Sequence, residues 1–267
     1  MNNVLPPHVE AFRQAARRIP AYRTLLQEAG IEAEQIRSAE DFARVPILEK
    51  RSTFQRFPVA ELCVDGELGR LGSVLTSSGH SGIFAYGLTS AEAQGDAARA
   101  IDELLDYVFG VRSRPTLLVD CLPMGVEVHT GACTLAETSV RPDMVVGLVK
   151  AFGAHYQQII LVGEAAFIKH TLELGARSGI DWKNLLVHVI VGEEPLAENA
   201  RKYIEALLNI DVARPETGIV ASSMGVAELG LNLFSEVPPP VVLVAPRRTL
   251  HESPELRHAV LGEAEFI

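Results

Sequence analysis

The sequence predicts an α/β protein whose doubly wound, mainly parallel sheet is flanked by helices. Beyond Pro115, short and nearly continuous apolar runs alternate with amphipathic segments. Parallel strands read as such runs because the connecting helices bury both faces of the sheet. The expected strands are Thr116–Val119, Gln158–Val162, Leu185–Val191 and Gly218–Ala221. The expected helices lie near Asp143–Phe152, Ala165–Ser178 and Ala197–Leu208.

Residues 1–70 are expected to form a helical N-terminal segment. Apolar residues recur at helical spacing before Pro20, and a second short helix ends at Gly30. Ser38-Ala39-Glu40-Asp41 has the pattern of a capping box that opens a further helical turn. The pattern changes at about residue 71, where Gly72–Thr76 and Ile83–Thr89 read as strands on either side of a polar loop.

The C-terminal residues, 236–267, are expected to start a small β-rich subdomain. A triple proline leads into the apolar run Val241–Val244, and Leu261–Ile267 again reads as a strand, with no neighbour in sequence to pair with. The sequence therefore divides into the helical segment 1–70, an α/β core at 71–235 and this third part.

Composition excludes several classes of function. Lys plus Arg number 24 and Asp plus Glu 34, which leaves a net charge of −10 and no basic block to bind nucleic acid or an anionic membrane. No apolar run reaches the roughly 18–20 residues that span a bilayer, and the N-terminus lacks the pattern of a secretion signal. Three scattered cysteines make no disulfide framework. We therefore expect a cytoplasmic protein.

The strongest local signal is a polar loop between the two early strands. Its residues are Thr76, Ser77, Ser78, Gly79, His80, Ser81 and Gly82. Hydroxyl groups and a flexible backbone suit the binding of an anion, although the same composition also fits a plain hairpin turn. The loop is neither a Walker loop nor a nucleophile elbow, because the Lys of the first and the Gly spacing of the second are missing.

Two further turns follow expected strands at the edge where parallel α/β sheets bind ligands. Gly192-Glu193-Glu194-Pro195-Leu196 fits either a site or an ordinary helix start with Pro195 at the first helical position. Ser222-Ser223-Met224-Gly225-Val226-Ala227-Glu228 ends on an acid that could ligate a hard cation or lie in solvent. Cys121 could be a nucleophile or a small buried residue, and His129 and Cys133 lack further ligands at metal spacing.

The order of these segments resembles the adenylate-forming superfamily of acyl-CoA synthetases, luciferases and peptide-synthetase adenylation domains, and in particular its phenylacetate–CoA ligase-like branch. Glu40–Lys50 is similar to that branch's "EDF…P…K" stretch and Thr76–Gly82 to its "SSGTTG" phosphate loop. Gly192–Leu196 followed by Arg201–Glu205 is similar to "GAEPL…R…IE", and Met224–Glu228 to "YGxTE". The resemblance spans roughly residues 15–235.

The resemblance implies ATP-dependent adenylation of a carboxylic acid, followed by transfer of the acyl group to a thiol such as CoA. It implies that Glu228 holds Mg²⁺ and that ATP lies against the three motifs. The implied nucleotide-binding residues are Thr76, Ser77, Ser78, Gly79, His80, Ser81, Gly82, Gly192, Glu193, Glu194, Pro195, Ser223, Met224, Gly225 and Ala227. The partners are then small molecules, and a homodimer is left open as the assembly.

Several positions depart from the family's pattern. His80 and Ala227 each replace a Thr, Met224 replaces the aromatic residue that packs on adenine, and no Lys follows the loop within Ile83–Ala85. These departures keep a second hypothesis open, a catalytically degenerate module that binds a nucleotide or acyl group. A third is an enzyme of the same fold that activates a non-carboxylate oxyanion or acylates a protein thiol.

Three expectations about the site follow. The three motifs should face one cleft. The acyl pocket should be lined by Pro123–Thr134 and by residues just before Met224, with His129 either near the carboxylate or a plain loop residue. By resemblance, the ribose-binding acid, the hinge and the C-terminal lid with its catalytic Lys lie beyond Ile267. This sequence alone should therefore not complete a thioester-forming cycle.

Overall fold

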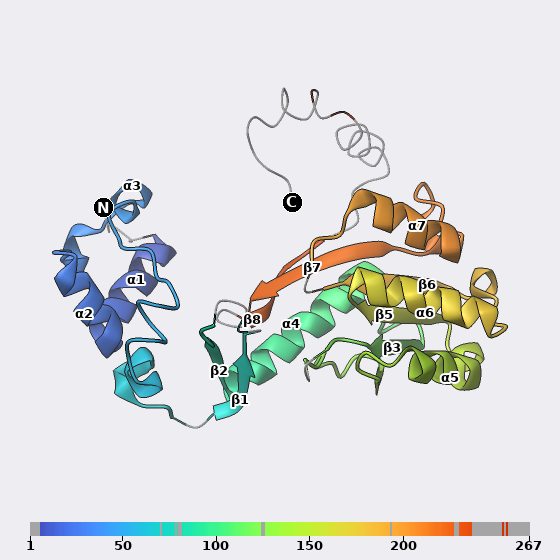
Figure 1. The fold of residues 1–267 in the computed structure, drawn as a ribbon, viewed down its shortest axis with the longest axis horizontal. Coiled ribbons are helices and arrows are strands. Elements are labelled where there is room, and N and C mark those ends of the chain that lie inside the picture. Colours follow the sequence, from blue (N-terminus) through green and yellow to red (C-terminus); the bar gives the residue numbers. More distant parts are fainter. Residues whose placement is uncertain are drawn as a thin grey trace. The chain divides into compact units, whose positions relative to one another are not determined.

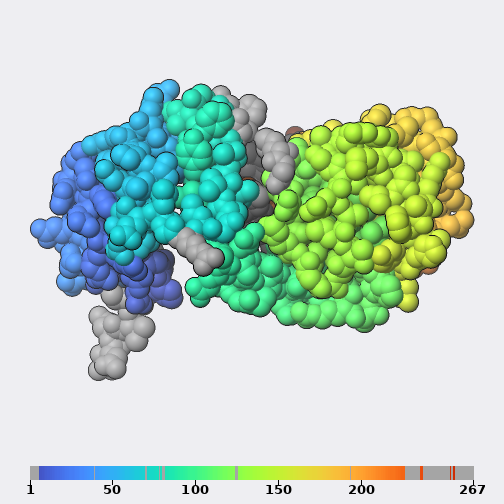
Figure 2. All heavy atoms as spheres, turned by 90° about the horizontal axis from the view of Figure 1, so that it is seen from below, coloured from blue at the N-terminus to red at the C-terminus, as the bar shows by residue number. Residues whose placement is uncertain are grey.

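The computed structural model describes residues 6–236 apart from 70, 78, 80–81, 124–125, 193 and 227–229, together with Ser253 and Glu255. The chain divides into two compact units, the first ending at Gln94 and the second beginning at Gly95. In Figure 2 the first unit runs from blue to blue-green and the second from green to orange. The expected β-rich start at 236–267 falls almost entirely outside the described residues.

The first unit begins with three helices, α1 (Pro7–Arg18), α2 (Pro20–Glu28) and α3 (Ala39–Phe42). Their apolar sides enclose a small core around Phe12, Leu26 and Ile36. The expected capping box is confirmed, because the Ser38 hydroxyl accepts from the Asp41 N–H while the Asp41 carboxylate accepts from the Ser38 N–H. Short 3₁₀ turns follow at Ala33–Gln35, Val59–Leu62 and Val64–Gly66.

A two-stranded antiparallel hairpin, β1 (Leu71–Thr76) and β2 (Tyr86–Ser90), completes the first unit. The chain then continues into α4 (Ala91–Phe109). Gly72 is required in β1, since a Cβ there would lie 2.9 Å from the backbone of Ala91.

The second unit is built on a six-stranded sheet in the order β4-β3-β5-β6-β7-β8. Figure 1 labels β3, β5, β6, β7 and β8 of this sheet. Its strands are β3 (Thr116–Asp120), β4 (Thr134–Glu137), β5 (Gln158–Gly163), β6 (Val187–Val191), β7 (Val220–Val226) and β8 (Gly230–Ser235). Neighbouring strands pair in parallel except β7 and β8, which are antiparallel. The predicted fold class, a mainly parallel sheet flanked by helices and preceded by a helical segment, is confirmed.

Helices cover both faces of this sheet. They are α4, α5 (Pro142–Phe152), α6 (Ala165–Arg177) and α7 (Glu198–Leu208), with 3₁₀ turns at Gly153–His155, Trp182–Asn184 and Pro215–Thr217. Successive strand residues point to opposite faces. Leu117 and Val119 pack in the cluster with α5, α6 and α7, whereas Leu118 between them packs with α4. None of the helices in the described part of the chain is both long and apolar enough to cross a bilayer.

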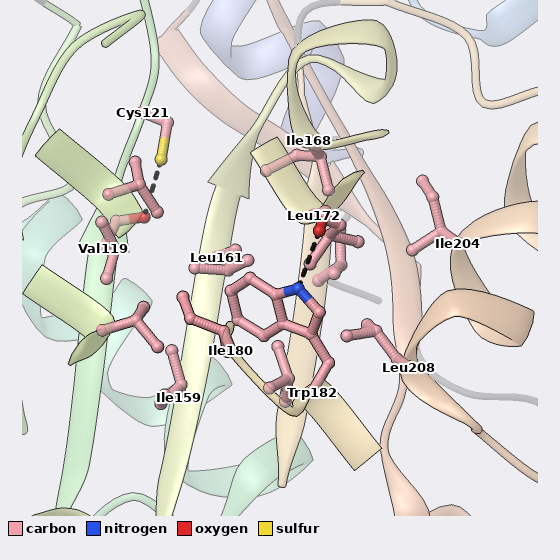
Figure 3. Packing of buried hydrophobic residues seen from close by; sticks show 14 of the residues in the cluster. Val119, Cys121, Ile159, Leu161, Ile168, Leu172, Ile180, Trp182, Ile204 and Leu208 are labelled. Atoms are coloured by element: carbon pink, nitrogen blue, oxygen red, sulfur yellow. Dashed lines mark hydrogen bonds between the residues drawn. The ribbon is translucent and has the colours of Figure 1, made fainter. Parts of the chain in front are cut away.

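The larger core cluster contains Trp182. Its indole N–H donates to the Leu172 carbonyl at 2.8 Å, and its ring lies near Leu161 and Ile180 (Figure 3). Gly175 makes room for the ring, because a Cβ there would lie 2.4 Å from Trp182 Cζ2. Trp182 thus packs against α6 within the cluster that also contains the buried strand residues.

A buried polar chain joins α4 to the amino ends of three strands. The Gln158 amide N–H groups donate to the Phe109 carbonyl and the Thr116 hydroxyl, and its oxygen lies 3.2 Å from His188 Nε2. Burial, with a smaller contribution from the charge of Arg114, lowers the pKa of His188 to about 4. His188 Nδ1 has no hydrogen-bond partner among the residues described, which fits a neutral imidazole in the folded protein.

Acidification is therefore expected to destabilise the second unit through His188. The folded-state pKa lies below the ordinary value near 6.5, so the unfolded chain takes up the proton more readily. This contribution to stability is complete above about pH 6.5 and is lost as the pH falls toward 4, by about 3 kcal/mol. Denaturant unfolding from pH 7 to 4 measures it. A His188→Gln variant should lose this part of the pH dependence, whereas a variant of the exposed His155, His155→Gln, should keep it. Equal pH dependence in all three proteins would contradict the prediction.

Candidate functional site

The predicted polar loop lies in the first unit, between β1 and β2. Thr76 is the last residue of β1, so the loop itself starts at Ser77. The Ser77 N–H donates to the Ala85 carbonyl at 3.0 Å, and the Ala85 N–H donates to the Ser77 hydroxyl oxygen at 3.0 Å. These two bonds close the loop at its base. Ser78, His80 and Ser81 lie outside the described residues.

The two glycines of the loop are required by its backbone. Gly79 has a φ of +70° and Gly82 a φ of +75°, values that side-chain-bearing residues rarely adopt. The Gly82 N–H donates to the Gly79 carbonyl at 2.8 Å, and a Cβ on Gly79 would lie 2.6 Å from the Phe84 ring. Such a tight, glycine-dependent loop can direct backbone N–H groups toward an anion.

The second unit presents the carboxyl ends of its parallel strands along one edge of the sheet. From β3 the chain moves to β4 on one side and then to β5 on the other. The strand order therefore reverses between β3 and β5, and such a switch point is where open α/β sheets bind ligands. The residues just beyond it are Cys121–Pro123 after β3 and Glu164 after β5.

Asp120 holds the loop that follows β3. The residue is 3% exposed, and its carboxylate accepts from the Leu122 N–H at 2.9 Å and the Val128 N–H at 2.8 Å. Burial raises the pKa of this carboxyl group, while the two hydrogen bonds act in the opposite direction. Asp120 belongs to none of the sequence motifs described above, although an acid that directly ends an apolar strand is a usable signal for such a residue.

Gly192 and Ser223, both predicted site residues, are brought together at this edge. A Cβ placed on Gly192 would lie 3.4 Å from Ser223 Oγ and 3.5 Å from Leu122 Cδ2. The turn after β6 thus contacts both β7 and the loop after β3. A side chain longer than that of alanine at position 192 would extend into the space beside Ser223 and Leu122.

The Ser222–Val226 segment is a strand, so its prediction as a turn is wrong. β7 runs to Val226, and Ser223, Met224 and Gly225 lie within it. Pairing with β6 stops at Ser222, after which β7 continues alone on that side and pairs with β8 on the other. Polar residues can extend the strand because β8 supplies the partner. Met224 is 58% exposed there. Ala227 and Glu228 lie outside the described residues.

The turn after β6 differs from the expected helix start. α7 begins at Glu198, so Pro195 is not at its first helical position; it is exposed in the preceding turn. The Glu194 carboxylate accepts from the Ala165 N–H at 2.7 Å and thereby caps the first turn of α6. Glu194 therefore has a structural role in joining the turn to α6. Glu193 lies outside the described residues.

His129 lies on the loop between β3 and β4. Its side chain is 41% exposed, and Nδ1 is 3.9 Å from the Glu127 carboxylate. The residues after it are held by Asp102 of α4, which accepts from the Thr130 hydroxyl at 2.5 Å and from the Gly131 N–H at 3.1 Å. The loop that carries His129 is thus fastened at both ends, by Asp120 and Asp102.

Cys121 does not have the properties of a nucleophile. It is fully buried, and burial raises the pKa of its thiol to about 12. Its sulfur lies 3.6 Å from the Val119 carbonyl oxygen (Figure 3). The reactive form of cysteine is the thiolate, so this residue serves packing rather than chemistry.

A metal ion at this edge would need oxygen ligands from elsewhere. No group of three or more His, Cys, Asp or Glu side chains that could hold a metal occurs among the residues the structure describes. Mg²⁺ is commonly bound by one or two carboxylates together with substrate phosphates. Glu228, the predicted magnesium ligand, lies outside the described residues.

Comparison with known proteins gives matches of structure only. No family model matches the sequence, and no curated protein does. An open conformation of 2-hydroxyisobutyryl-CoA ligase in complex with 2-HIB-AMP and CoA matches with a TM-score of 0.64 and 17% identity, over 86% of this chain and 55% of the ligase chain. The same ligase in its thioesterification state, with the same ligands, matches with a TM-score of 0.64 and 18% identity, over 82% of this chain and 47% of that one.

The chain thus spans about half the length of the ligase structures that it matches. At this level of identity the likeness concerns the fold. The fold of the chain resembles that of the matched part of 2-hydroxyisobutyryl-CoA ligase.

Proposed function

We propose that this chain provides the nucleotide- and acyl-binding part of an ATP-dependent, AMP-forming acid–thiol ligase. A carboxylate attacks the α-phosphorus of ATP and pyrophosphate leaves. A thiol such as CoA then attacks the acyl carbon of the acyl-adenylate, which forms the thioester and releases AMP and the thiol proton. The observation that supports this most is the fold shared over 86% of the chain with a ligase solved with an acyl-AMP and CoA. Residues 71–235 form the core in this proposal, with 1–70 as a helical segment and 236–267 as the start of a β-rich subdomain.

The proposal gives each segment a role. The Thr76–Gly82 loop would hold the departing phosphates with its N–H groups. Glu228 would hold Mg²⁺, whose charge would offset that of the phosphates. Gly192, Ser223 and Met224 lie on the adenine side. The exposed thioether of Met224 is a polarisable surface on which a ring can rest. That the three motifs face one cleft stays a prediction.

The proposed acyl pocket is lined by the loop Pro123–Thr134 and by residues just before Met224, with His129 near the carboxylate. The hydrogen bonds to Asp120 and Asp102 support this assignment, because a binding loop is more selective when its backbone is held in place. The exposure of His129 leaves its ring accessible to a ligand.

A second candidate is a module that binds a nucleotide or acyl group without catalysis. It is favoured by the engagement of Glu194 with α6 and by the absence of a lysine at Ile83–Ala85. ATP–pyrophosphate exchange with a panel of carboxylic acids separates the two, since only the ligase supports exchange. Exchange with phosphonates or other oxyanions alone would instead indicate a different substrate class on the same fold.

A Glu228→Gln variant is expected to weaken Mg·ATP binding by about tenfold or more, because a neutral amide replaces a magnesium ligand. Calorimetric titration with Mg·ATP measures the effect, and the same titration without magnesium should show little difference from wild type. Glu216→Gln, which neutralises an exposed acid outside the proposed site, is the matched control. Unchanged Mg·ATP affinity in Glu228→Gln would remove Glu228 from the site.

A further inference from the structure

Lys50 contacts the polar loop from a distant part of the sequence. Its ammonium group donates to the Ser77 hydroxyl oxygen at 3.0 Å, across a separation of 27 residues. The same oxygen accepts the Ala85 N–H at 3.0 Å. A serine hydroxyl has two acceptor lone pairs and one donor proton. With both lone pairs engaged by Lys50 and Ala85, the Ser77 hydroxyl proton is left to donate to an acceptor other than these two groups.

The segment that carries Lys50 is held against the hairpin. The phenyl ring of Phe54 meets the Tyr86 ring of β2 edge-on, with 6.1 Å between the ring centroids. A helical turn supports this contact, since the Glu49 carbonyl accepts from the Thr53 N–H at 3.0 Å and from its hydroxyl at 2.7 Å. Lys50 lies within this turn and is half-buried rather than fully exposed to solvent. Its position at the loop is therefore determined by packing.

The loop needs a cation from outside its own sequence if it is to bind phosphates. Residues 76–85 contain no lysine or arginine, and the chain carries a net charge of −10. Backbone N–H groups alone supply only partial positive charge. An ammonium group has three donors and a compact full charge, so one donor can hold Ser77 while the charge still acts on a neighbouring anion.

We propose that Lys50 is the cationic residue of this loop and that, together with the Ser77 hydroxyl proton, it binds the polyphosphate chain of a nucleoside triphosphate. This inference rests on the proposed function in that it takes the loop as the phosphate site. It goes further because it assigns the charge to a residue of the N-terminal helical segment. That segment then forms part of the binding site rather than an appendage.

The test is calorimetric binding of three probes, inorganic tripolyphosphate, Mg·ATP and adenosine, to wild type and Lys50→Met. The variant is expected to weaken tripolyphosphate and Mg·ATP by about tenfold or more and to leave adenosine unchanged. Its affinity for tripolyphosphate should also fall less steeply with added salt, because one ionic contact is gone. Lys50→Arg keeps the charge and should restore most of the affinity. Lys169→Met, at an exposed lysine of α6 next to Glu173, is the matched control.

The outcomes separate this inference from the function on which it rests. Full tripolyphosphate affinity in Lys50→Met would overturn the role of Lys50 and leave the loop as the phosphate site. Equal weakening of all three probes, together with a lower melting temperature in both Lys50 variants, would show that Lys50 only holds the hairpin. A wild-type protein that binds neither tripolyphosphate nor Mg·ATP would overturn the proposed function and this inference with it.

Discussion

Replacement of Trp182 by alanine is expected to lower the free energy of unfolding of the second unit by about 3–5 kcal/mol. The side chain is 3% exposed, and its removal leaves a cavity within the cluster that joins α6 to the sheet. The Leu172 carbonyl also loses the indole donor at 2.8 Å. Chemical denaturation monitored by far-UV circular dichroism measures the loss. Tryptophan fluorescence cannot report on this variant, because Trp182 is the single tryptophan of the sequence.

Gly175 provides a sharper test of the same packing. Gly175→Ala should destabilise the wild-type protein by about 1–3 kcal/mol, because its Cβ would overlap the Trp182 ring. In a Trp182→Leu background the same substitution should cost much less, since the ring is gone. Gly147→Ala in α5 is the matched control: a Cβ there has nothing within 4 Å, so alanine should stabilise that helix by up to about 1 kcal/mol. Equal effects of Gly175→Ala in both backgrounds would contradict this account.

Replacement of Arg201 by methionine is expected to cost about 3–5 kcal/mol, the range for breaking a buried ion pair. The side chain is 8% exposed; it donates to the Val220 carbonyl and to the Glu236 carboxylate, the latter at 2.7 Å. Arg201 Nε lies 3.4 Å from Glu198 but forms no hydrogen bond with it, so that contact is electrostatic. Removing the arginine leaves the carboxylates of Glu198 and Glu236 without this positive charge in a poorly solvated environment.

The same network fixes the position of β7, the strand that carries Met224. The Glu236 carboxylate accepts the Ser222 N–H at 3.0 Å, and the Glu236 N–H donates to the Ser222 carbonyl at 2.7 Å. Amide hydrogen exchange in the Arg201→Met variant should therefore become faster in β7 and β8 than in β3 and β5, each compared with the same strand of the wild type. Arg141→Met is the control, because its ion pair with Asp143 is 60% exposed on both sides and should contribute at most about 1 kcal/mol. An equal increase of the exchange rate in all strands of the sheet would refute the role of Arg201 in positioning β7.

The strands and helices of the second unit could be predicted because their signals are local. β3, β5 and β6 are buried on every or nearly every residue, so each is visible as an apolar run. β4 was missed because an exposed edge strand, Thr134–Glu137, has no such run. The length of β7 was also missed, since Ser222 and Ser223 carry no strand signal. Their conformation follows from pairing with β8, which periodicity within β7 cannot show.

The candidate site likewise has features that the sequence predicts and contacts that only the tertiary structure decides. The sequence shows which residue types follow each strand and which glycines the polar loop needs. It can do so because the conformation of a turn depends on a few residues that are neighbours in sequence. The contacts that give these residues their roles join positions far apart. Lys50 meets Ser77, Glu194 caps α6 at Ala165, and the approach of Gly192 to Ser223 follows from β6 and β7 being neighbours. Strand order and packing alone decide such pairs, because a hydrogen bond acts over about 3 Å in space whatever the separation along the chain.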